Sequence, residues 1–236
     1  MRLLEPEIES LAQEIASLGA QALVAFDADG TLWSGDIGED LLRVLATQKR
    51  LLDPPFADPY AHYEDLFASD PPAAFAYCVQ AMKGLKVEDV EGWSLELFES
   101  KYRPRLFPGM QWLLEHFQSA GVVVSLVSAS NAITVRAAAK ALGVDSKLVL
   151  AVEGRVDASG RLTGEVLPPV TCSGGKVEAI RQKLGRAPAL ACGNSLFDRE
   201  MLEFAQRAVM VAPEGSEGPA VALAKARGWL LHRTRT

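Results

Sequence analysis

Short apolar runs alternate with helical apolar stripes along most of the chain. The run Ala22–Phe26 (ALVAF) has no polar position, which is typical of a strand buried on both faces of a parallel sheet. Similar runs lie at Val122–Val127, Lys147–Ala151, Ala187–Cys192 and Ala208–Val211. Helical stripes precede and separate them, at Leu4–Leu18, Met110–Phe117, Ala132–Leu142, Lys176–Leu184 and Leu196–Ala205. This alternation predicts an α/β fold with a Rossmann-like, doubly wound parallel sheet.

Two stretches interrupt the alternation. Residues 37–103 contain no convincing buried strand, but they show helical spacing at Ile37, Leu41, Leu42 and Leu45. We interpret them as a helical subdomain inserted after the first strand, so that 1–36 and 104–236 form the core domain. The second stretch, Val152–Val166, has turn residues near its middle and predicts a β-hairpin.

The composition fits a folded domain with a buried core. The chain has 236 residues, of which 49% are hydrophobic and 23% are charged, and this excludes a disordered polar chain. The net charge of −6 argues against nucleic acid as a partner. The longest apolar stretch is far too short to span a bilayer, so we expect no membrane partner.

Cysteine usage and the first residues indicate the compartment. The three cysteines, Cys78, Cys172 and Cys192, form no C-x-x-C pair. The start, MRLLEPEIES, has no apolar run of signal-peptide length. We therefore expect a reduced, cytoplasmic protein. The three histidines are scattered, which argues against a zinc site or a Ser-His-Asp triad, and the oligomeric state stays undetermined.

The first predicted strand runs into two acids, Asp27 and Asp29. Carboxylates directly after a buried strand are costly unless they bind a cation or take part in chemistry. A solvated turn and the short D-x-D motif of metal-dependent glycosyltransferases remain alternatives. An EF-hand calcium loop is excluded, because position six would be Leu32 and position twelve Gly38.

Polar residues also follow the next strand and open a later helix. Ser128 comes at the end of a strand, where its hydroxyl and free N–H groups suit an oxyanion, although N-capping by Ser130 or Asn131 needs no ligand. Lys176 lies in the first turn of a helix, where a cation opposes the helix dipole. We expect Lys176 to point at an anion, the alternative being an exposed surface lysine.

Asn194 and Asp198 follow the run Ala187–Cys192. Spaced by one helical turn, they can face the same cleft, although Asp198 could simply favour the helix dipole. The ends of parallel strands share one edge of a sheet, where ligands bind. We therefore predict one composite site, formed by an acid pair, a serine, a lysine, and then an amide with an acid. Each of these lies at the end of a strand or the start of a helix.

The motifs FDADGT, LVSAS, Lys176 and GNSLFD resemble the four motifs of the haloacid dehalogenase-like hydrolase superfamily. The similarity is closest to the phosphatase branch that includes phosphoserine phosphatases, and 37–103 would be its helical cap. The resemblance implies that Asp27 is the nucleophile and that Asp29 is the general acid and then the base. It implies phosphate binding by Ser128, Ala129 and Lys176. It implies a magnesium cofactor held by Asp27, Asp29, Asn194 and Asp198.

One position departs from that branch. The residue at 194 is usually Asp there, and Asn194 brings one negative charge less to the metal. Asn is also found in metal-independent 2-haloacid dehalogenases, but those lack the second acid, which is present here as Asp29. We therefore expect a magnesium-dependent phosphatase for a small phosphorylated metabolite. A dehalogenase-type hydrolase and a non-catalytic phosphoacceptor module are the alternatives.

The substrate is only partly indicated by the sequence. By resemblance to phosphoserine phosphatases, Asp36 stands where an acid meets the substrate amine, although it could instead cap the next helix. No arginine is clearly placed to bind a substrate carboxylate, and Lys83 is a candidate only by region. Phosphoserine is thus one candidate among small phosphomonoesters.

Overall fold

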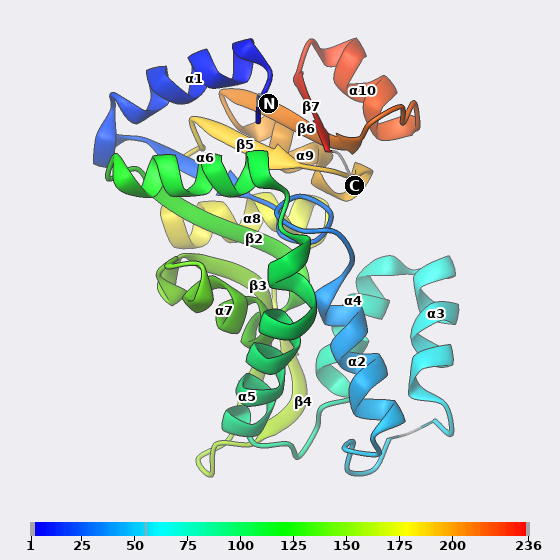
Figure 1. Ribbon diagram of the computed structural model, residues 1–236. Helices are drawn as coiled ribbons and strands as arrows, with labels where there is room; N and C mark the ends of the chain where they lie inside the picture. Colours follow the sequence, from blue (N-terminus) through cyan, green and yellow to red (C-terminus); the bar gives the residue numbers. More distant parts are fainter. Residues whose placement is uncertain (1–2, 55, 235–236) are drawn as a thin grey trace.

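The central feature of the fold is a seven-stranded sheet (Figure 1). The computed structural model describes residues 3–54 and 56–234. In this part of the chain the strand order is β4-β3-β2-β1-β5-β6-β7, and all neighbours are parallel except the β3–β4 pair. The strands are β1 (Leu23–Phe26), β2 (Val123–Asn131), β3 (Val149–Val156), β4 (Leu162–Leu167), β5 (Leu190–Gly193), β6 (Arg207–Pro213) and β7 (Leu230–Thr234). The predicted α/β fold and the predicted hairpin are confirmed.

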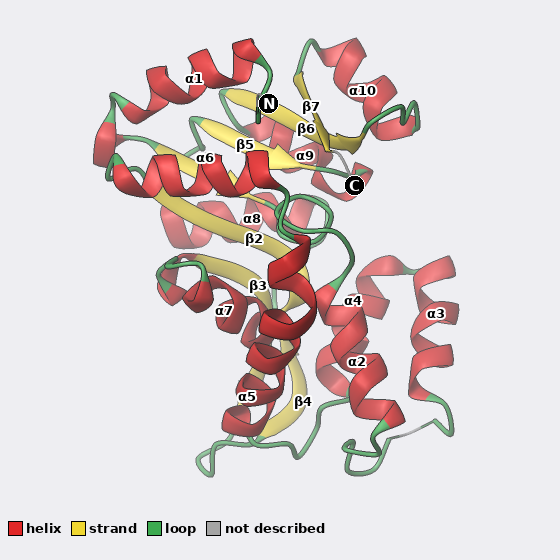
Figure 2. Ribbon diagram, viewed as in Figure 1, coloured by secondary structure: helices red, strands yellow, loops and turns green. Residues whose placement is uncertain are grey.

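Helices cover both faces of the sheet (Figure 2). One face packs against α1 (Pro6–Ala16), α6 (Pro108–Ser119) and α7 (Ala132–Ala141). The other packs against α8 (Gly174–Leu184), α9 (Arg199–Phe204) and α10 (Pro219–Arg227). Side chains alternate along β1, because Val24 and Phe26 join the first apolar cluster and Ala25 joins the second. Burial on both faces explains why these strands contain continuous apolar runs.

The insert after β1 is helical, as predicted. It comprises α2 (Ile37–Thr47), α3 (Pro59–Ser69), α4 (Pro71–Gln80) and α5 (Val87–Leu97), followed by a π-helical turn at Phe98–Tyr102. Its apolar residues form a separate cluster that includes Leu41, Leu45 and Tyr77. The hydroxyls of Ser94 in α5 and Thr134 in α7 hydrogen-bond at 2.9 Å, which ties the insert to the core.

The structure differs from the sequence prediction in three elements. Strand β2 continues past Val127 to Asn131, because Asn131 pairs with Val152 of β3. The predicted helix 196–205 is a 3₁₀ turn, Leu196–Asp198, followed by the short α9. Helix α10 and edge strand β7 were not predicted, since LLHRT mixes polar and apolar residues without a buried run. No helix within the described residues has the length and apolar character needed to cross a membrane.

Candidate active site

The turn after β1 places two carboxylates at the carboxyl edge of the sheet. Asp27 continues the backbone hydrogen bonding between β1 and β5, because its N–H donates to the Cys192 carbonyl at 2.9 Å. Its side-chain Oδ2 accepts a hydrogen bond of 2.7 Å from Thr31 Oγ1. Gly30 has a φ of +73°, and a Cβ there would lie 2.1 Å from the Asn194 amide. This tight turn therefore requires glycine. It brings the FDADGT motif into contact with Asn194 of the GNSLFD motif.

Lys176 lies between two buried carboxylates. Its side chain is only 2% exposed, and Nζ lies 2.6 Å from both Asp27 Oδ1 and Asp198 Oδ1. Burial and the charge of Asp198 raise the pKa of Asp27 to about 7, although Lys176 acts in the opposite direction. Burial alone would lower the pKa of Lys176, but the two carboxylates raise it. The surface alternative for Lys176 is thus wrong, and its ammonium stays charged at the base of the site.

Asp29 is held by four donors from three elements. Its Oδ1 accepts from Trp33 Nε1 and from the Ile37 N–H, both at 2.8 Å. Its Oδ2 accepts from Ser130 Oγ at 2.7 Å and, more weakly, from Ser128 Oγ at 3.5 Å. Burial raises the pKa of Asp29 despite these hydrogen bonds. A fixed carboxyl group with increased proton affinity suits general acid–base chemistry.

Asp198 organises the last motif. Its Oδ2 accepts from the N–H groups of Asn194 and Ser195 and from Ser195 Oγ, each at 3.0 Å. Its Oδ1 accepts from Lys176. Both oxygens of Asp198 are therefore used by the chain's own donors, and the side chain fixes the loop that carries Asn194.

The Asn194 amide faces a group of oxygen atoms. One of its two terminal atoms lies 3.1 Å from the Asp29 carbonyl oxygen and 3.2 Å from Asp27 Oδ2. If this atom is nitrogen, the amide donates to both oxygens. If it is oxygen, three acceptor oxygens converge, and the Thr31 hydroxyl, 3.3 Å from the amide oxygen and 2.7 Å from Asp27 Oδ2, is a donor beside them. Since Mg²⁺ prefers oxygen ligands, the donor set of Asp27, the Asp29 carbonyl and Asn194 fits that metal.

No cluster of three His, Cys, Asp or Glu side chains suited to a metal occurs within residues 3–54 and 56–234. The oxygen group at Asn194 differs from such a cluster, because one ligand is an amide and another a backbone carbonyl. The candidate metal site therefore depends on which way the amide of Asn194 points.

A cavity of about 160 Å³ joins these groups to the insert. All seven predicted catalytic, phosphate-binding and metal-binding residues line it: Asp27, Asp29, Ser128, Ala129, Lys176, Asn194 and Asp198. Asp36 lines it as well and also caps α2, accepting from the Glu39 N–H at 2.8 Å. Burial and the charge of Asp29 raise the pKa of Asp36 well above its usual value. Lys83 is exposed and packs near Gly164, away from the cavity.

Sequence reasoning missed the walls of the cavity. Tyr63, Phe67 and Phe75 come from α3 and α4, and Phe197 follows β5. Ring centroids of Phe197 lie 6.0 Å from Phe67 and 6.1 Å from Phe75, in edge-to-face arrangements. Aromatic residues in a helical insert look like ordinary core positions, so no sequence motif identified them.

The role of Ser130 was also missed. Its hydroxyl donates to Asp29, whereas sequence analysis considered it only as a helix cap. The cap of α7 is Asn131, whose Oδ1 accepts from the Thr134 N–H at 3.0 Å. The alternation of side chains along β2 could have indicated that Ser128 and Ser130 face the same side.

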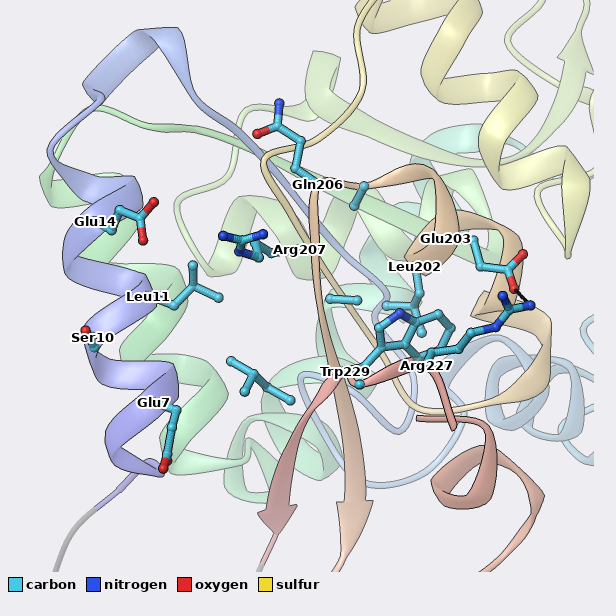
Figure 3. Close-up of a pocket in the computed structure, with 14 residues that line it drawn as sticks. Glu7, Ser10, Leu11, Glu14, Leu202, Glu203, Gln206, Arg207, Arg227 and Trp229 are labelled. Atoms are coloured by element: carbon cyan, nitrogen blue, oxygen red, sulfur yellow. Dashed lines mark ion pairs between the residues drawn. The ribbon is translucent and has the colours of Figure 1, made fainter. Parts of the chain in front are cut away.

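A larger cavity, of about 560 Å³, lies between α1 and the starts of β6 and β7 (Figure 3). It is at the amino end of these strands, opposite the edge where ligands bind in open α/β sheets. Arg227 in its lining is already paired with Glu203 at 2.6 Å. None of the predicted site residues lines this cavity, so the smaller cavity is the candidate active site.

Known proteins resemble this chain in sequence and in fold. A family model described as haloacid dehalogenase-like hydrolase matches residues 24–203. No curated protein sequence matches significantly. Among solved structures, a protein of unknown function from Bordetella pertussis Tohama I is 23% identical, with a TM-score of 0.76 over 89% of this chain and 96% of that one.

Two further solved structures have names related to phosphoserine. A phosphoserine phosphohydrolase-like protein from Francisella tularensis subsp. tularensis SCHU S4 is 16% identical, with a TM-score of 0.60 over 90% of this chain and 95% of that one. A substrate-bound phosphoserine phosphatase is 19% identical, with a TM-score of 0.58 over 91% and 93%. At these identities the structural matches show a shared fold.

Proposed function

Because the chain belongs to the haloacid dehalogenase-like hydrolase family, we propose that it is a magnesium-dependent phosphatase that hydrolyses a small phosphomonoester through a phosphoaspartate. The observation that supports this most is the contact of Asp27 with Lys176 at 2.6 Å, beside a separately held Asp29. One carboxylate is thereby placed as a nucleophile and the other as a proton carrier. Two acids with such different partners suit two different roles.

Asp27 is the proposed nucleophile. Its oxygen attacks phosphorus, the bond to the leaving oxygen breaks, and the phosphoryl group is carried by the carboxylate. Lys176 keeps Asp27 in position and offsets the negative charge of the incoming phosphoryl oxygens. Ser128 and the backbone at Ala129 are the proposed donors to those oxygens, since both residues line the cavity.

Asp29 is the proposed proton carrier. It gives its proton to the leaving oxygen and later takes one from the water that hydrolyses the phosphoaspartate. Trp33 and Ile37 hold Oδ1, so that Oδ2, beside Ser128 and Ser130, is the oxygen that exchanges the proton. Its raised pKa favours the protonated form needed for the first step.

The Asp29→Asn variant should slow turnover of alkyl phosphates by about 10²–10⁴-fold, the usual contribution of general acid–base catalysis. The loss should be smaller for an aryl phosphate, because a good leaving group needs less protonation. The measurement is kcat on one alkyl and one aryl phosphate for both proteins. Equal losses on the two substrates would contradict the acid role of Asp29.

The residues present fit a magnesium ion. Asp27, the Asp29 carbonyl and Asn194 would hold it, while Asp198 positions the Asn194 loop. When bound, the ion offsets charge on the phosphoryl oxygens. The alternative orientation of Asn194 needs no metal, because the amide then donates to the same oxygens.

A magnesium titration tests the proposed function. Wild-type protein should release phosphate from phosphomonoesters only with magnesium, and Asn194→Asp should reach half-maximal activity at lower magnesium, because a carboxylate adds one charge at the ion. Thermal unfolding over the same titration reports binding without turnover. An unchanged midpoint would show that Asn194 does not contact the metal. Activity that survives chelation in both proteins would favour the metal-independent hydrolase.

We assign residues 37–103 to the cap and 1–36 with 104–236 to the core. Phe67 and Phe75 of the cap contact Phe197 of the core beside the cavity. A cap that covers the site excludes water while the phosphoryl group is captured. We also propose that the protein works in the cytoplasm. The three cysteines are free and buried, as expected for a reducing compartment.

A further inference from the structure

The cavity has an acidic side opposite the phosphate-binding groups. Asp36 and Glu39, at the start of α2, both line it. Asp36 Oδ1 is used by the Glu39 N–H, and Glu39 Oε1 is used by Arg43 and Tyr60. Each carboxylate keeps its other oxygen without a hydrogen bond to any described residue. These oxygens are available to a donor or a cation brought by the substrate.

Aromatic rings complete this end of the cavity. Phe67, Phe75 and Phe197 form a mutually edge-to-face group, and Tyr63 lies 6.0 Å from Phe67 between ring centroids. Tyr63 is 3% exposed and lines the cavity with these rings. Rings beside carboxylates form a favourable environment for an alkylammonium group.

The same cavity offers no free cationic side chain to a substrate carboxylate. Lys176 is its only basic side chain within residues 3–54 and 56–234, and both Asp27 and Asp198 contact it. Arg43 and Lys83 do not line the cavity. A carboxylate next to Asp36 and Glu39 would lie beside two acidic groups and find no counter-ion, which opposes binding.

The volume limits the substrate further. About 160 Å³ is well below the roughly 300–1,000 Å³ typical of pockets for drug-sized ligands. A phosphoryl group and a short cationic chain are compatible with this space.

We propose that the substrate is the phosphomonoester of a short alkanolamine without a carboxylate, whose ammonium group binds among Asp36, Glu39, Tyr63 and the phenylalanine rings. This inference rests on the proposed phosphatase function and specifies its substrate class. The phosphate end meets Lys176 and Ser128, and the cationic end meets the cap. Phosphoethanolamine and phosphocholine both have this chemistry.

A matched pair of substrates isolates the charge. Phosphocholine and 3,3-dimethylbutyl phosphate have nearly the same shape, but the second has carbon in place of the quaternary nitrogen. With magnesium present, kcat/KM for phosphocholine should exceed that for the neutral analogue by about tenfold or more, as expected for a cation desolvated among rings and carboxylates. Phosphoserine should be a poorer substrate than phosphoethanolamine by about tenfold or more, since it adds an unpaired carboxylate. Comparing phosphoethanolamine with phosphocholine shows whether the carboxylates or the rings contribute more to binding the cationic group.

Two variants test which residues carry the preference. Asp36→Asn should lower the ratio of kcat/KM for phosphocholine to that for the neutral analogue by about tenfold, while Asn still caps α2. The control is Asp58→Asn, the same change at the cap of α3, outside the cavity. Phe67→Leu should lower the ratio by about threefold to tenfold. Its control is Phe56→Leu, because these two rings are 39% and 41% exposed and only Phe67 lines the cavity.

The outcomes separate this inference from the proposed function. Equal kcat/KM for phosphocholine and its neutral analogue, or a preference for phosphoserine, would overturn the alkanolamine assignment while leaving a working phosphatase. A preference that Asp36→Asn and Phe67→Leu do not reduce would also overturn it, because the cation would bind elsewhere. Failure to release phosphate from any phosphomonoester, aryl phosphates included, would overturn the phosphatase function itself and this inference with it.

Discussion

Replacing Asp27 by asparagine should abolish turnover while leaving the fold intact. We expect a loss of about 10⁴-fold or more in kcat, since removal of a covalent nucleophile is among the most damaging changes to an enzyme. The amide has nearly the shape of the carboxylate, and Thr31 can rotate its hydroxyl to accept from the new NH₂ group. The measurements are kcat on the best phosphomonoester and acid-quench trapping of phosphorylated protein, which should be seen for the wild type only.

The control for Asp27→Asn is Asp58→Asn, an exposed N-cap far from the cavity lining. It should retain wild-type turnover. Unfolding in urea should show that Asp27→Asn remains folded, so that lost activity reflects chemistry. If Asp27→Asn keeps activity within about tenfold of wild type, a barrier change near 1.4 kcal/mol, Asp27 is not the nucleophile.

Replacing Lys176 by methionine should remove activity and also destabilise the protein strongly. Asp27 and Asp198 would be left buried without their shared cation. Removing one partner of a buried ion pair typically costs about 3–5 kcal/mol in the free energy of unfolding. Lys183→Met is a matched control, because Lys183 is an exposed lysine of the same helix, α8. Surface changes of this kind usually stay within about 0.5 kcal/mol.

The cost of Lys176→Met should depend on pH in a defined direction. Burial already raises the pKa of Asp27 to about 7, well above that of an aspartate in an unfolded chain. Asp27 therefore contributes stability at low pH that is lost as the pH rises toward 7. Without the ammonium this pKa rises further, and the native state of the variant loses more stability on going to high pH than the wild type does. Urea unfolding of both proteins at about pH 5.5 and about pH 8 measures this. A larger cost at the lower pH, or a cost no greater than that of Lys183→Met, would contradict the account.

The sequence determined the fold class and the polar half of the candidate site. Strands buried on both faces must be continuously apolar, so β1 and β5 were visible as runs, and Asp27 and Asn194 stood out directly after them. Parallel strands bring their carboxyl ends to one edge, so residues far apart in the chain were predicted to meet, and the cavity contains them all. Edge strand β7 and helix α10 were not predicted, since neither has a clear apolar pattern.

The tertiary structure decided how the predicted residues divide their roles. Lys176 could have been a surface residue, and only packing placed it between Asp27 and Asp198. Asp198 was expected to face the metal, and its hydrogen bonds to the Asn194 loop are visible only in the folded chain. The aromatic and acidic end of the cavity likewise comes from α2, α3, α4 and the turn after β5. Such contacts between distant segments depend on how helices pack, which a local apolar pattern does not specify. The sequence therefore predicted the phosphate-binding end of the cavity. Only the structure defined the opposite end, which we propose selects the substrate.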